Sequence, residues 1–488
     1  MRSFIVKFWF CVAIILILQG CITTNPTTGN RVFTGGMTAQ DEIILGRKNH
    51  PKMLKLFSGE YEDKLLGSYV SSVGKLLAQT VERRQFNYKF TVLNSGVVNA
   101  FALPGGYIYI TRGLLALAGS ESEMAAVLAH ELGHINGLHH AQRQGKKVLT
   151  NAVLTSVGIA AGKEVARFSD IIASGLLSAL SREDEIDSDN LSFRYLARAG
   201  FDPHAVPSFL AKLRANARLN AKRGGKAPDS VDDFDYFGTH PIPAERLAHA
   251  KIEAQKYQEA SSLGDRNVYL DKIDGMLFGD DPEQGLIIGR VFAHPKLRFQ
   301  FQVPKNYSLF NLPTSVIARG PNRETIIFDQ AKETADGPVS FYLTEVWGKD
   351  LRLENIENID VNGLSGATAE ARVRTARGMR DLRMVAIKKD LQTVYRFAFY
   401  TEPGRIKQHS LAFRRVTHSF RILSKQEAKS LKPLRVRIQT AKSGDTIETL
   451  SRKMRVDNLY REEHFRVING LGVNDSIVSG RKYKIIAN

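Results

Sequence analysis

The sequence predicts an α+β protein of several domains, and three observations support this prediction. A helical apolar pattern over residues 120–138 follows two extended segments at 97–103 and 107–110, which predicts a mainly helical domain with a small sheet. Residues 266–425 change to short alternating segments, which indicate an antiparallel sheet. From Leu434 to the end the pattern indicates strand, helix, helix, strand. The chain has 488 residues, enough for several buried cores.

The N-terminal segment predicts export. Basic residues precede an apolar run that is short for a membrane span. The run ends in Leu18-Gln19-Gly20-Cys21, which resembles a bacterial lipobox. This resemblance implies that residues 1–20 are a signal peptide of the lipoprotein type and that Cys21 is lipidated after cleavage. Because Ile22 follows in place of an aspartate, we expect a periplasmic protein anchored to the outer membrane. The alternative is an uncleaved anchor helix.

Cysteine content and charge agree with an exported protein. Cys11 and Cys21 are the only cysteines, so no disulfide framework remains after cleavage and lipidation. Cleavage removes Arg2 and Lys7 and no acidic residue, which lowers the net charge from +18 to +16. A basic surface suits anionic partners of the cell envelope, such as lipid head groups or cell-wall polymers. The chain contains no nucleic-acid-binding motif, and we expect no nucleic-acid partner.

The motif His130-Glu131-Leu132-Gly133-His134 carries the strongest chemical signal. It follows Ser120-Glu121-Ser122-Glu123, which fits a capping box and predicts the start of a helix. On a helix His130 and His134 share one face, where two imidazoles can bind one Zn²⁺. Glu131 then lies beside the ion as the general base for the attacking water. The motif therefore predicts zinc-dependent peptide hydrolysis, and the alternative is a pair of structural histidines.

A catalytic zinc usually has three protein ligands, and the chain offers two candidates for the third. The string from His130 to His140 matches the metzincin pattern, but the methionine turn of that class is missing, since the next methionine is Met276. We therefore expect His140 on the surface. The second candidate is Glu185, which shares a helical face with Asp189. Glu185 would bind the metal, and Asp189 would accept the N–H of a ligand imidazole. The alternative for this pair is a solvated acidic face.

Further motifs occur in the order found in a known peptidase family. Over about residues 30–260 the chain resembles the gluzincin metallopeptidases of the HtpX, Ste24, Oma and BepA type. The segments that carry this resemblance are Asn99–Gly106, Thr111–Leu115, the HELGH helix, Ser181–Asp189, Ala199–Pro203 and Thr239–Arg246. The resemblance implies a zinc metallopeptidase domain at residues 21–265. In that domain His130, His134 and Glu185 would be the ligands of one Zn²⁺ per chain, and Glu131 the base.

The same resemblance implies roles for two residues further along the chain. His240 is a candidate latch that reaches the zinc and plugs its open position, and Arg246 is a candidate for stabilising the oxyanion. The alternative for His240 is an ordinary loop histidine before a proline-rich turn. Ser188 departs from the family pattern, in which an alanine usually precedes the aspartate.

The extended segment before the active-site helix has an expected role in substrate binding. Pro104-Gly105-Gly106 predicts a turn between two strands. In zinc peptidases an edge strand binds an extended substrate by β-augmentation, and the resemblance places Asn99, Ala100, Phe101 and Ala102 on that strand. Backbone pairing tolerates many side chains, so unfolded segments would be favoured over one sequence. The alternative is an ordinary core hairpin.

Two further domains are expected after the peptidase domain. Residues 266–428 predict an α+β domain that weakly resembles PsbP/Mog-type domains, with binding or spacing as its role. Residues 434–488 resemble a LysM module, on the strength of Ala441–Ile447, Phe465–Leu471 and Ser479–Tyr483. LysM modules bind N-acetylglucosamine-containing glycans, so this resemblance implies peptidoglycan as a partner.

Together these features predict a lipid-anchored zinc endopeptidase that degrades misfolded or misassembled envelope proteins. Two alternatives remain at this stage. One is a peptidoglycan hydrolase guided by the LysM-like module. The other is a chaperone or scaffold that keeps the fold but is held shut by His240.

Overall fold

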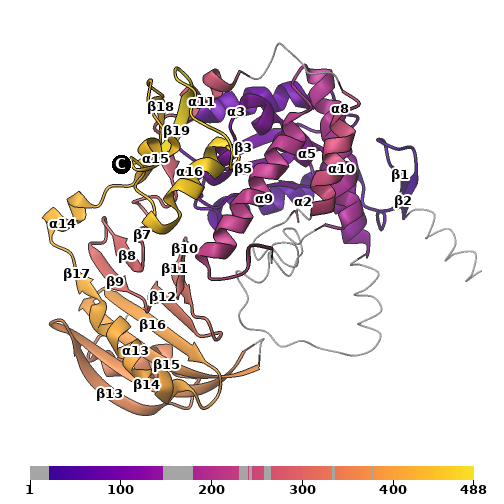
Figure 1. Ribbon diagram of the computed structural model, residues 1–488. Helices are drawn as coiled ribbons and strands as arrows, with labels where there is room; N and C mark the ends of the chain where they lie inside the picture. The colour runs from indigo at the N-terminus through magenta and orange to yellow at the C-terminus, as the bar shows by residue number, and fades with distance from the viewer. Residues whose placement is uncertain are drawn as a thin grey trace, which may run out of the picture. The chain divides into compact units, whose positions relative to one another are not determined.

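The computed structural model describes residues 21–146, 180–229, 240, 244–257, 265–331, 336–375 and 378–488. The predicted signal peptide, residues 1–20, lies outside them. The chain divides into two compact units, each with helices and sheets, which confirms the α+β multidomain class (Figure 1). Unit 1 comprises the chain up to Phe278 together with Arg435–Ala487, and unit 2 comprises Gly279–Leu434. None of the helices in the described residues is long and apolar enough to cross a membrane.

Unit 1 is mainly helical. Its helices are α2 (Ala39–Leu56), α3 (Lys64–Ala78), α4 (Arg112–Leu117), α5 (Glu121–Asn136), α8 (Arg182–Ala199), α9 (Ala205–Arg223), α10 (Ala244–Ala254), α11 (Arg266–Ile273), α15 (Ile447–Ser451), the short 3-10 helix η3 (Asn458–Tyr460) and α16 (Arg461–Asn469). Its strands are β1 (Ile22–Thr24), β2 (Arg31–Phe33), β3 (Lys89–Leu93), β4 (Ala100–Leu103), β5 (Tyr107–Thr111), β6 (Leu277–Phe278), β18 (Leu434–Thr440) and β19 (Lys482–Ala487).

The predicted hairpin before the active-site helix is present in unit 1. Strand β4 pairs antiparallel with β5, which pairs parallel with β3, so β4 lies at the edge of this three-stranded sheet. The turn between β4 and β5 requires glycine at position 105, where φ is +81°. A Cβ there would also lie 2.7 Å from the carbonyl oxygen of Glu42 in α2. This close approach fixes the hairpin against α2.

A second hairpin begins directly after Cys21. Strands β1 and β2 pair antiparallel, and the N–H of Thr34 donates to the carbonyl oxygen of Cys21 at 2.9 Å. The buried side chain of Asn25 donates to the carbonyl oxygen of Gly137 at 3.1 Å, where α5 ends. The start of the described chain is therefore attached to the end of the active-site helix.

Helix α5 starts where the sequence predicts. Ser120 is the N-cap, and its side chain accepts from the N–H of Glu123. The carboxylate of Glu123, which the capping box would direct to the backbone N–H of Ser120, instead accepts from the N–H of Gly119 at 2.7 Å and from Nζ of Lys212 at 2.7 Å. Burial raises the pKa of Glu123, but Lys212 and these hydrogen bonds outweigh it and lower the pKa overall.

The C-terminal segment, Arg435–Ala487, packs inside unit 1. It has the predicted order of strand, helix, helix, strand, and β18 pairs antiparallel with β19. Lys484 of β19 is 1% exposed, and its Nζ donates to three carbonyl oxygens at the end of α4, those of Ala116 (2.7 Å), Leu117 (3.0 Å) and Ala118 (2.6 Å). An ammonium group has three N–H donors, so these carbonyls can satisfy all of them. Burial lowers the pKa of Lys484.

A second contact joins the C-terminal segment to α9, which lies beside α16 (Figure 1). Nζ of Lys222 donates to Glu463 at 2.7 Å, and the guanidinium of Arg223 donates to Nδ1 of His464 at 3.0 Å. The segment therefore contacts both the helix that precedes α5 and the end of α9.

Unit 2 contains the predicted antiparallel sheet. Its seven-stranded sheet has the order β10-β11-β12-β16-β15-β14-β13, and a second sheet has the order β17-β9-β8-β7. The strands are β7 (Leu286–Ile288), β8 (Val291–His294), β9 (Phe299–Gln302), β10 (Ser308–Leu312), β11 (Ser315–Arg319), β12 (Thr325–Gln330), β13 (Glu354–Val361), β14 (Leu364–Thr375), β15 (Gly378–Asp390), β16 (Thr393–Thr401) and β17 (Arg421–Ile422). The helices are α12 (Val339–Phe341), the π-helix η2 (Tyr342–Trp347), α13 (Ile406–Ser419) and α14 (Lys425–Ser430).

Side chains on both faces of this large sheet are buried. Along β16, Phe397 and Phe399 join one core with Phe413 of α13, whereas Ala398 joins another core with Leu343 of η2. This alternation follows from the two-residue period of a strand. It confirms a substantial antiparallel sheet, while the resemblance to PsbP/Mog-type domains stays a prediction.

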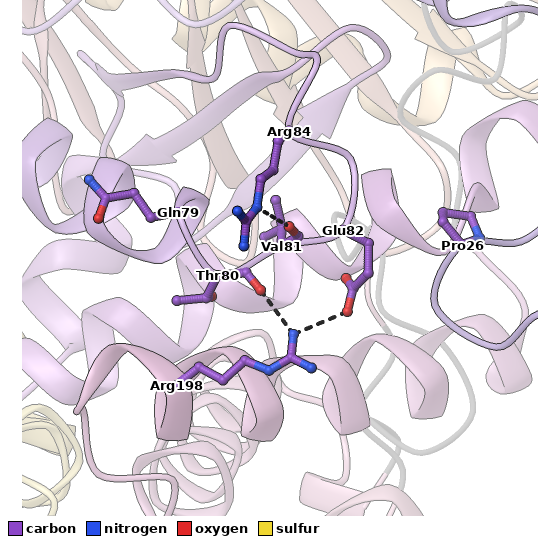
Figure 2. A pocket seen from close by; sticks show the side chains of 7 residues that line it. All are labelled: Pro26, Gln79, Thr80, Val81, Glu82, Arg84 and Arg198. Atoms are coloured by element: carbon purple, nitrogen blue, oxygen red, sulfur yellow. Dashed lines mark hydrogen bonds and ion pairs between the residues drawn. The ribbon is translucent and has the colours of Figure 1, made fainter.

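A surface pocket of about 710 Å³ lies in unit 1 beside the end of α3 (Figure 2). It is lined by Pro26, Gln79, Thr80, Val81, Glu82, Arg84 and Arg198. The guanidinium of Arg198 donates to the carbonyl oxygen of Thr80 and to the carboxylate of Glu82 (Figure 2).

Candidate metal centre

Two histidines of α5 and one glutamate of α8 meet at one buried point. Nε2 of His130 and Nε2 of His134 are 2.9 Å apart. Oε2 of Glu185 is 3.4 Å from Nε2 of His130, and Oε1 is 3.6 Å from Nε2 of His134. All three side chains are buried. The structure thus brings together the three residues that the sequence predicts as metal ligands.

The two helices that carry these residues approach each other at Gly133. A Cβ at position 133 would lie 2.5 Å from Oγ of Ser188, so only glycine permits this packing distance. The hydroxyl of Ser188 donates to the carbonyl oxygen of His130. The serine that departs from the family pattern therefore adds a hydrogen bond between α5 and α8.

Asp189 lies behind His130, as predicted. Its Oδ1 is 2.9 Å from Nδ1 of His130, on the side of the ring that faces away from Glu185. Arg246 of α10 binds this carboxylate with two nitrogens, Nε at 2.7 Å and Nη2 at 2.8 Å. Its Nη1 donates to Oε2 of Glu185. The guanidinium expected at the oxyanion thus contacts the two carboxylates in this structure.

The charges around the site keep Glu185 and Asp189 ionised. Burial raises the pKa of both groups, but the cation of Arg246 acts on each, and His240 acts on Glu185. The net pKa of Asp189 is below its usual range, and that of Glu185 is well below it. The same two carboxylates raise the pKa of His130 to about 9 although burial lowers it.

His240 lies against the three predicted ligands. Its Nδ1 is 2.9 Å from Oε1 of Glu185 and 3.4 Å from Nε2 of His130. Its Nε2 is 3.4 Å from Oε1 of Glu131. Glu131 is 2% exposed, and burial raises the pKa of its carboxyl group, with His240 and His130 acting in the opposite direction.

These residues fit a metal ion. Among the described residues, His130, His134, Glu185 and His240 each offer one donor atom, and all four atoms lie within 4.8 Å of one another. Donors that bind a tetrahedral ion at about 2.1 Å lie roughly 3.4 Å apart. Most of the donor separations above are close to that value. Two imidazoles, one carboxylate and a fourth position are the composition of a catalytic metal site.

His140 has a different place from the one predicted. We expected it on the surface, but it is 7% exposed, so that prediction is wrong. Its ring centroid is 6.1 Å from that of His134, and it is not one of the four grouped donors. His140 is therefore buried, but it lies outside the group of donor atoms.

His139 is a further residue at the site that the sequence did not predict. Its Nδ1 is 2.9 Å from Nδ1 of His134, and its Nε2 is 3.1 Å from Oδ2 of Asp187. The available signal was the His139-His140 pair just after the helix, but no local rule says which of the two turns back toward the site. Asp187 is one of several acidic residues at the start of α8, and the sequence does not distinguish it from the others.

The predicted substrate strand lies next to the active-site helix. Strand β4 packs against α5, and the side chains of Ala100, Phe101 and Ala102 are buried. Asn99 precedes the strand, and its carbonyl oxygen accepts from the N–H of Thr111. Because the side chains of β4 are buried, any contact between this strand and a substrate would use backbone groups.

Solved structures offer a likeness to part of the chain. The cyanobacterial PsbP of Synechocystis sp. PCC 6803 matches with 17% identity and a TM-score of 0.23, over 28% of this chain and 95% of that chain. A likeness at this TM-score carries no argument here.

Curated proteins match part of this chain in sequence. A beta-barrel assembly-enhancing protease of Escherichia coli O157:H7 is 29% identical over 221 residues, 43% of each chain. The mitochondrial metalloendopeptidase OMA1 of Schizosaccharomyces pombe is 30% identical over 218 residues, 41% of this chain and 60% of that one. The chain thus spans about half the length of these curated relatives.

The family described as Peptidase family M48 matches residues 65–254. This range contains α5, α8 and α10, and with them all four grouped donors and Glu131. Residues 65–254 of this chain are therefore a Peptidase family M48 domain, which is a metallopeptidase domain.

Proposed function

We propose that this protein is a zinc-dependent endopeptidase of the bacterial cell envelope that degrades misfolded or misassembled envelope proteins. The observation that carries this proposal is the buried cluster of His130, His134 and Glu185 with the carboxylate of Glu131 beside it. A relative named for enhancing beta-barrel assembly supports the choice of envelope proteins as substrates. Cys21 as a lipidation site supports a periplasmic protein tethered to the outer membrane.

The donor set favours zinc over other divalent metals. Imidazole nitrogens with one carboxylate oxygen suit Zn²⁺, whereas Mg²⁺ and Ca²⁺ prefer sites made only of oxygen donors. His130, His134 and Glu185 would hold the ion. When bound, zinc supplies a Lewis acid that polarises the scissile carbonyl and makes a water molecule more acidic.

The chain's own groups perform the proton transfers. Glu131 is positioned to accept the proton of the attacking water and to deliver it to the amine that leaves. Asp189 holds His130 through Nδ1 and so leaves Nε2 of that ring available to the metal. Arg246 fixes the carboxylates of Asp189 and Glu185. Its role at the oxyanion is a second proposal for the same side chain.

The edge strand supports a preference for unfolded chains. An extended peptide that pairs with β4, the last strand of its sheet, would lie next to α5, and Asn99, Ala100, Phe101 and Ala102 would bind it through backbone groups. Folded domains cannot supply such an extended segment. The C-terminal segment resembles a LysM module, and we propose peptidoglycan as its partner, which would place the enzyme near the cell wall.

The test is proteolysis of an unfolded substrate by the purified chain, residues 21–488. We expect cleavage of casein or of an unfolded outer-membrane protein, loss of cleavage after treatment with a zinc chelator, and recovery on addition of Zn²⁺. Purified peptidoglycan serves as the competing substrate. Release of peptidoglycan fragments without any cleavage of protein would overturn the proposal in favour of a cell-wall hydrolase.

His240 is proposed to latch the site. Its ring contacts Glu185 and Glu131, so it occupies the space that a substrate carbonyl and water need. A latch worth about 1 kcal/mol leaves the site open for about one-sixth of the time. We therefore expect His240→Ala to raise the rate of casein cleavage about sixfold, measured with saturating zinc.

His249→Ala is the matched control, because His249 lies on α10 outside the donor cluster. It should leave the rate unchanged. A fall in rate for His240→Ala at full zinc occupancy would show that His240 assists the reaction and would contradict the latch.

A further inference from the structure

The ligand His134 rests on a second histidine. Its Nδ1 faces Nδ1 of His139 at 2.9 Å, and Nε2 of His139 faces Oδ2 of Asp187 at 3.1 Å. His139 is 3% exposed. Asp184, the next nearest carboxylate, is 3.9 Å from the same nitrogen, so Asp187 is the closer partner. The three side chains form a chain of contacts that ends at the atom of His134 opposite its ligand nitrogen.

The backbone is shaped to allow this arrangement. Leu138, just after α5, has φ of +61°, a left-handed conformation that is unfavourable for a residue with a branched side chain. That turn brings His139 back beneath His134. At Gly137 a Cβ would lie 2.6 Å from Nε2 of His139 and 3.1 Å from Oδ2 of Asp187. A glycine is therefore needed to leave room for the contact between His139 and Asp187.

If both rings are neutral, the two contacts of His139 allow only one arrangement of donors and acceptors. The carboxylate of Asp187 can only accept, so Nε2 of His139 carries the proton. Nδ1 of His139 then has a lone pair and accepts from Nδ1–H of His134. This leaves Nε2 of His134 without a proton, and Nε2 is the atom that faces Glu185 and His130.

We propose that His139, held by Asp187, is a positioning residue that fixes the tautomer and ring orientation of His134 for metal binding. It is the counterpart of Asp189 behind His130, but it uses an imidazole ring where the other ligand has a carboxylate. The proposal rests on the proposed metal site and adds the means by which its second imidazole is prepared. Contacts of this kind typically change metal affinity by about 10- to 100-fold.

The test measures zinc affinity of the full-length chain by competition with a chromophoric chelator, and so does not depend on proteolysis. His139→Ala is expected to weaken zinc binding about 10- to 100-fold. His139→Asn places an amide oxygen near the position of Nδ1 and should restore binding to within a few-fold of the original protein. His139→Gln reaches the position of Nε2, cannot accept from His134, and should resemble His139→Ala.

Two further variants guard against a general loss of structure. Asp187→Ala removes the acceptor from a side chain that is 33% exposed, so it should fold and bind zinc several-fold more weakly. Glu183→Gln, an exposed residue on the same helix, should have no effect. Equal affinities for the alanine variant and the original protein would overturn the proposal. So would equal weakening by all three substitutions of His139 together with a lower melting temperature of the metal-free protein. An original protein that binds no zinc would instead refute the proposed function.

Discussion

Replacing Glu131 by glutamine is expected to lower the rate of proteolysis about 10³-fold while zinc remains bound. A general base contributes typically 10²- to 10⁴-fold, and glutamine keeps the shape of the side chain but cannot accept a proton. Such a loss corresponds to about 4 kcal/mol of transition-state stabilisation. Zinc should stay bound because Glu131 is not one of the four grouped donors. The rate of casein cleavage and the zinc content per chain are the two measurements.

The control is Glu183→Gln, the same change at an exposed position of α8. It should leave both measurements unchanged. The envelope phenotype of cells that carry Glu131→Gln distinguishes an enzyme from a scaffold. If Glu131→Gln preserved every envelope phenotype with zinc bound, the protein would act as a chaperone or scaffold and the endopeptidase proposal would fail.

Lys484→Met is expected to have the largest effect on stability. Methionine matches the length of lysine but donates no hydrogen bond, so three buried carbonyls at the end of α4 would lose their partner. An unsatisfied buried polar group costs about 1–3 kcal/mol. We expect a loss of at least about 3 kcal/mol in the free energy of unfolding of unit 1. Chemical denaturation followed by fluorescence would measure it.

Lys482→Met is the matched control two positions earlier on β19. Lys482 makes an exposed ion pair with Asp271, at 2.6 Å and 2.7 Å to the two carboxylate oxygens. Exposed pairs contribute about 0–1 kcal/mol, so this variant should be nearly as stable as the original protein. Equal, small losses for both variants would show that the burial of Lys484 adds little.

The parts of the site that the sequence predicted are those set by helical spacing. His130 and His134 are four residues apart, as are Glu185 and Asp189, and helical geometry alone puts each pair on one face. Ser120 marks the start of α5 by local capping chemistry, and it acts as the N-cap in the structure. Likewise, the strands of unit 2 follow from alternation over a few residues.

The parts that were missed depend on contacts between distant segments. Arg246 is satisfied by carboxylates of another helix, and Lys484 by carbonyls more than 360 residues away in the chain. His139 turns toward the site because Leu138 has a left-handed backbone conformation. Such a conformation is usually signalled by glycine, but this position holds leucine. The capping box predicted the wrong hydrogen-bond partner for the carboxylate of Glu123 for the same reason, since that carboxylate accepts from Lys212 of α9. Local rules cannot rank such long-range partners.

If Cys21 is lipidated as proposed, the hairpin that follows it would limit how far the catalytic centre can lie from the membrane. Asn25 lies only four positions after Cys21, a distance of at most about 14 Å, and its side chain donates a hydrogen bond at the end of α5. A lipid on Cys21 would then attach the folded domain to the membrane without a flexible linker. The height of the catalytic centre above the bilayer would be set by the folded domain itself. Unfolded segments of substrates would then have to lie near the membrane surface, because the catalytic centre could not move far away from it.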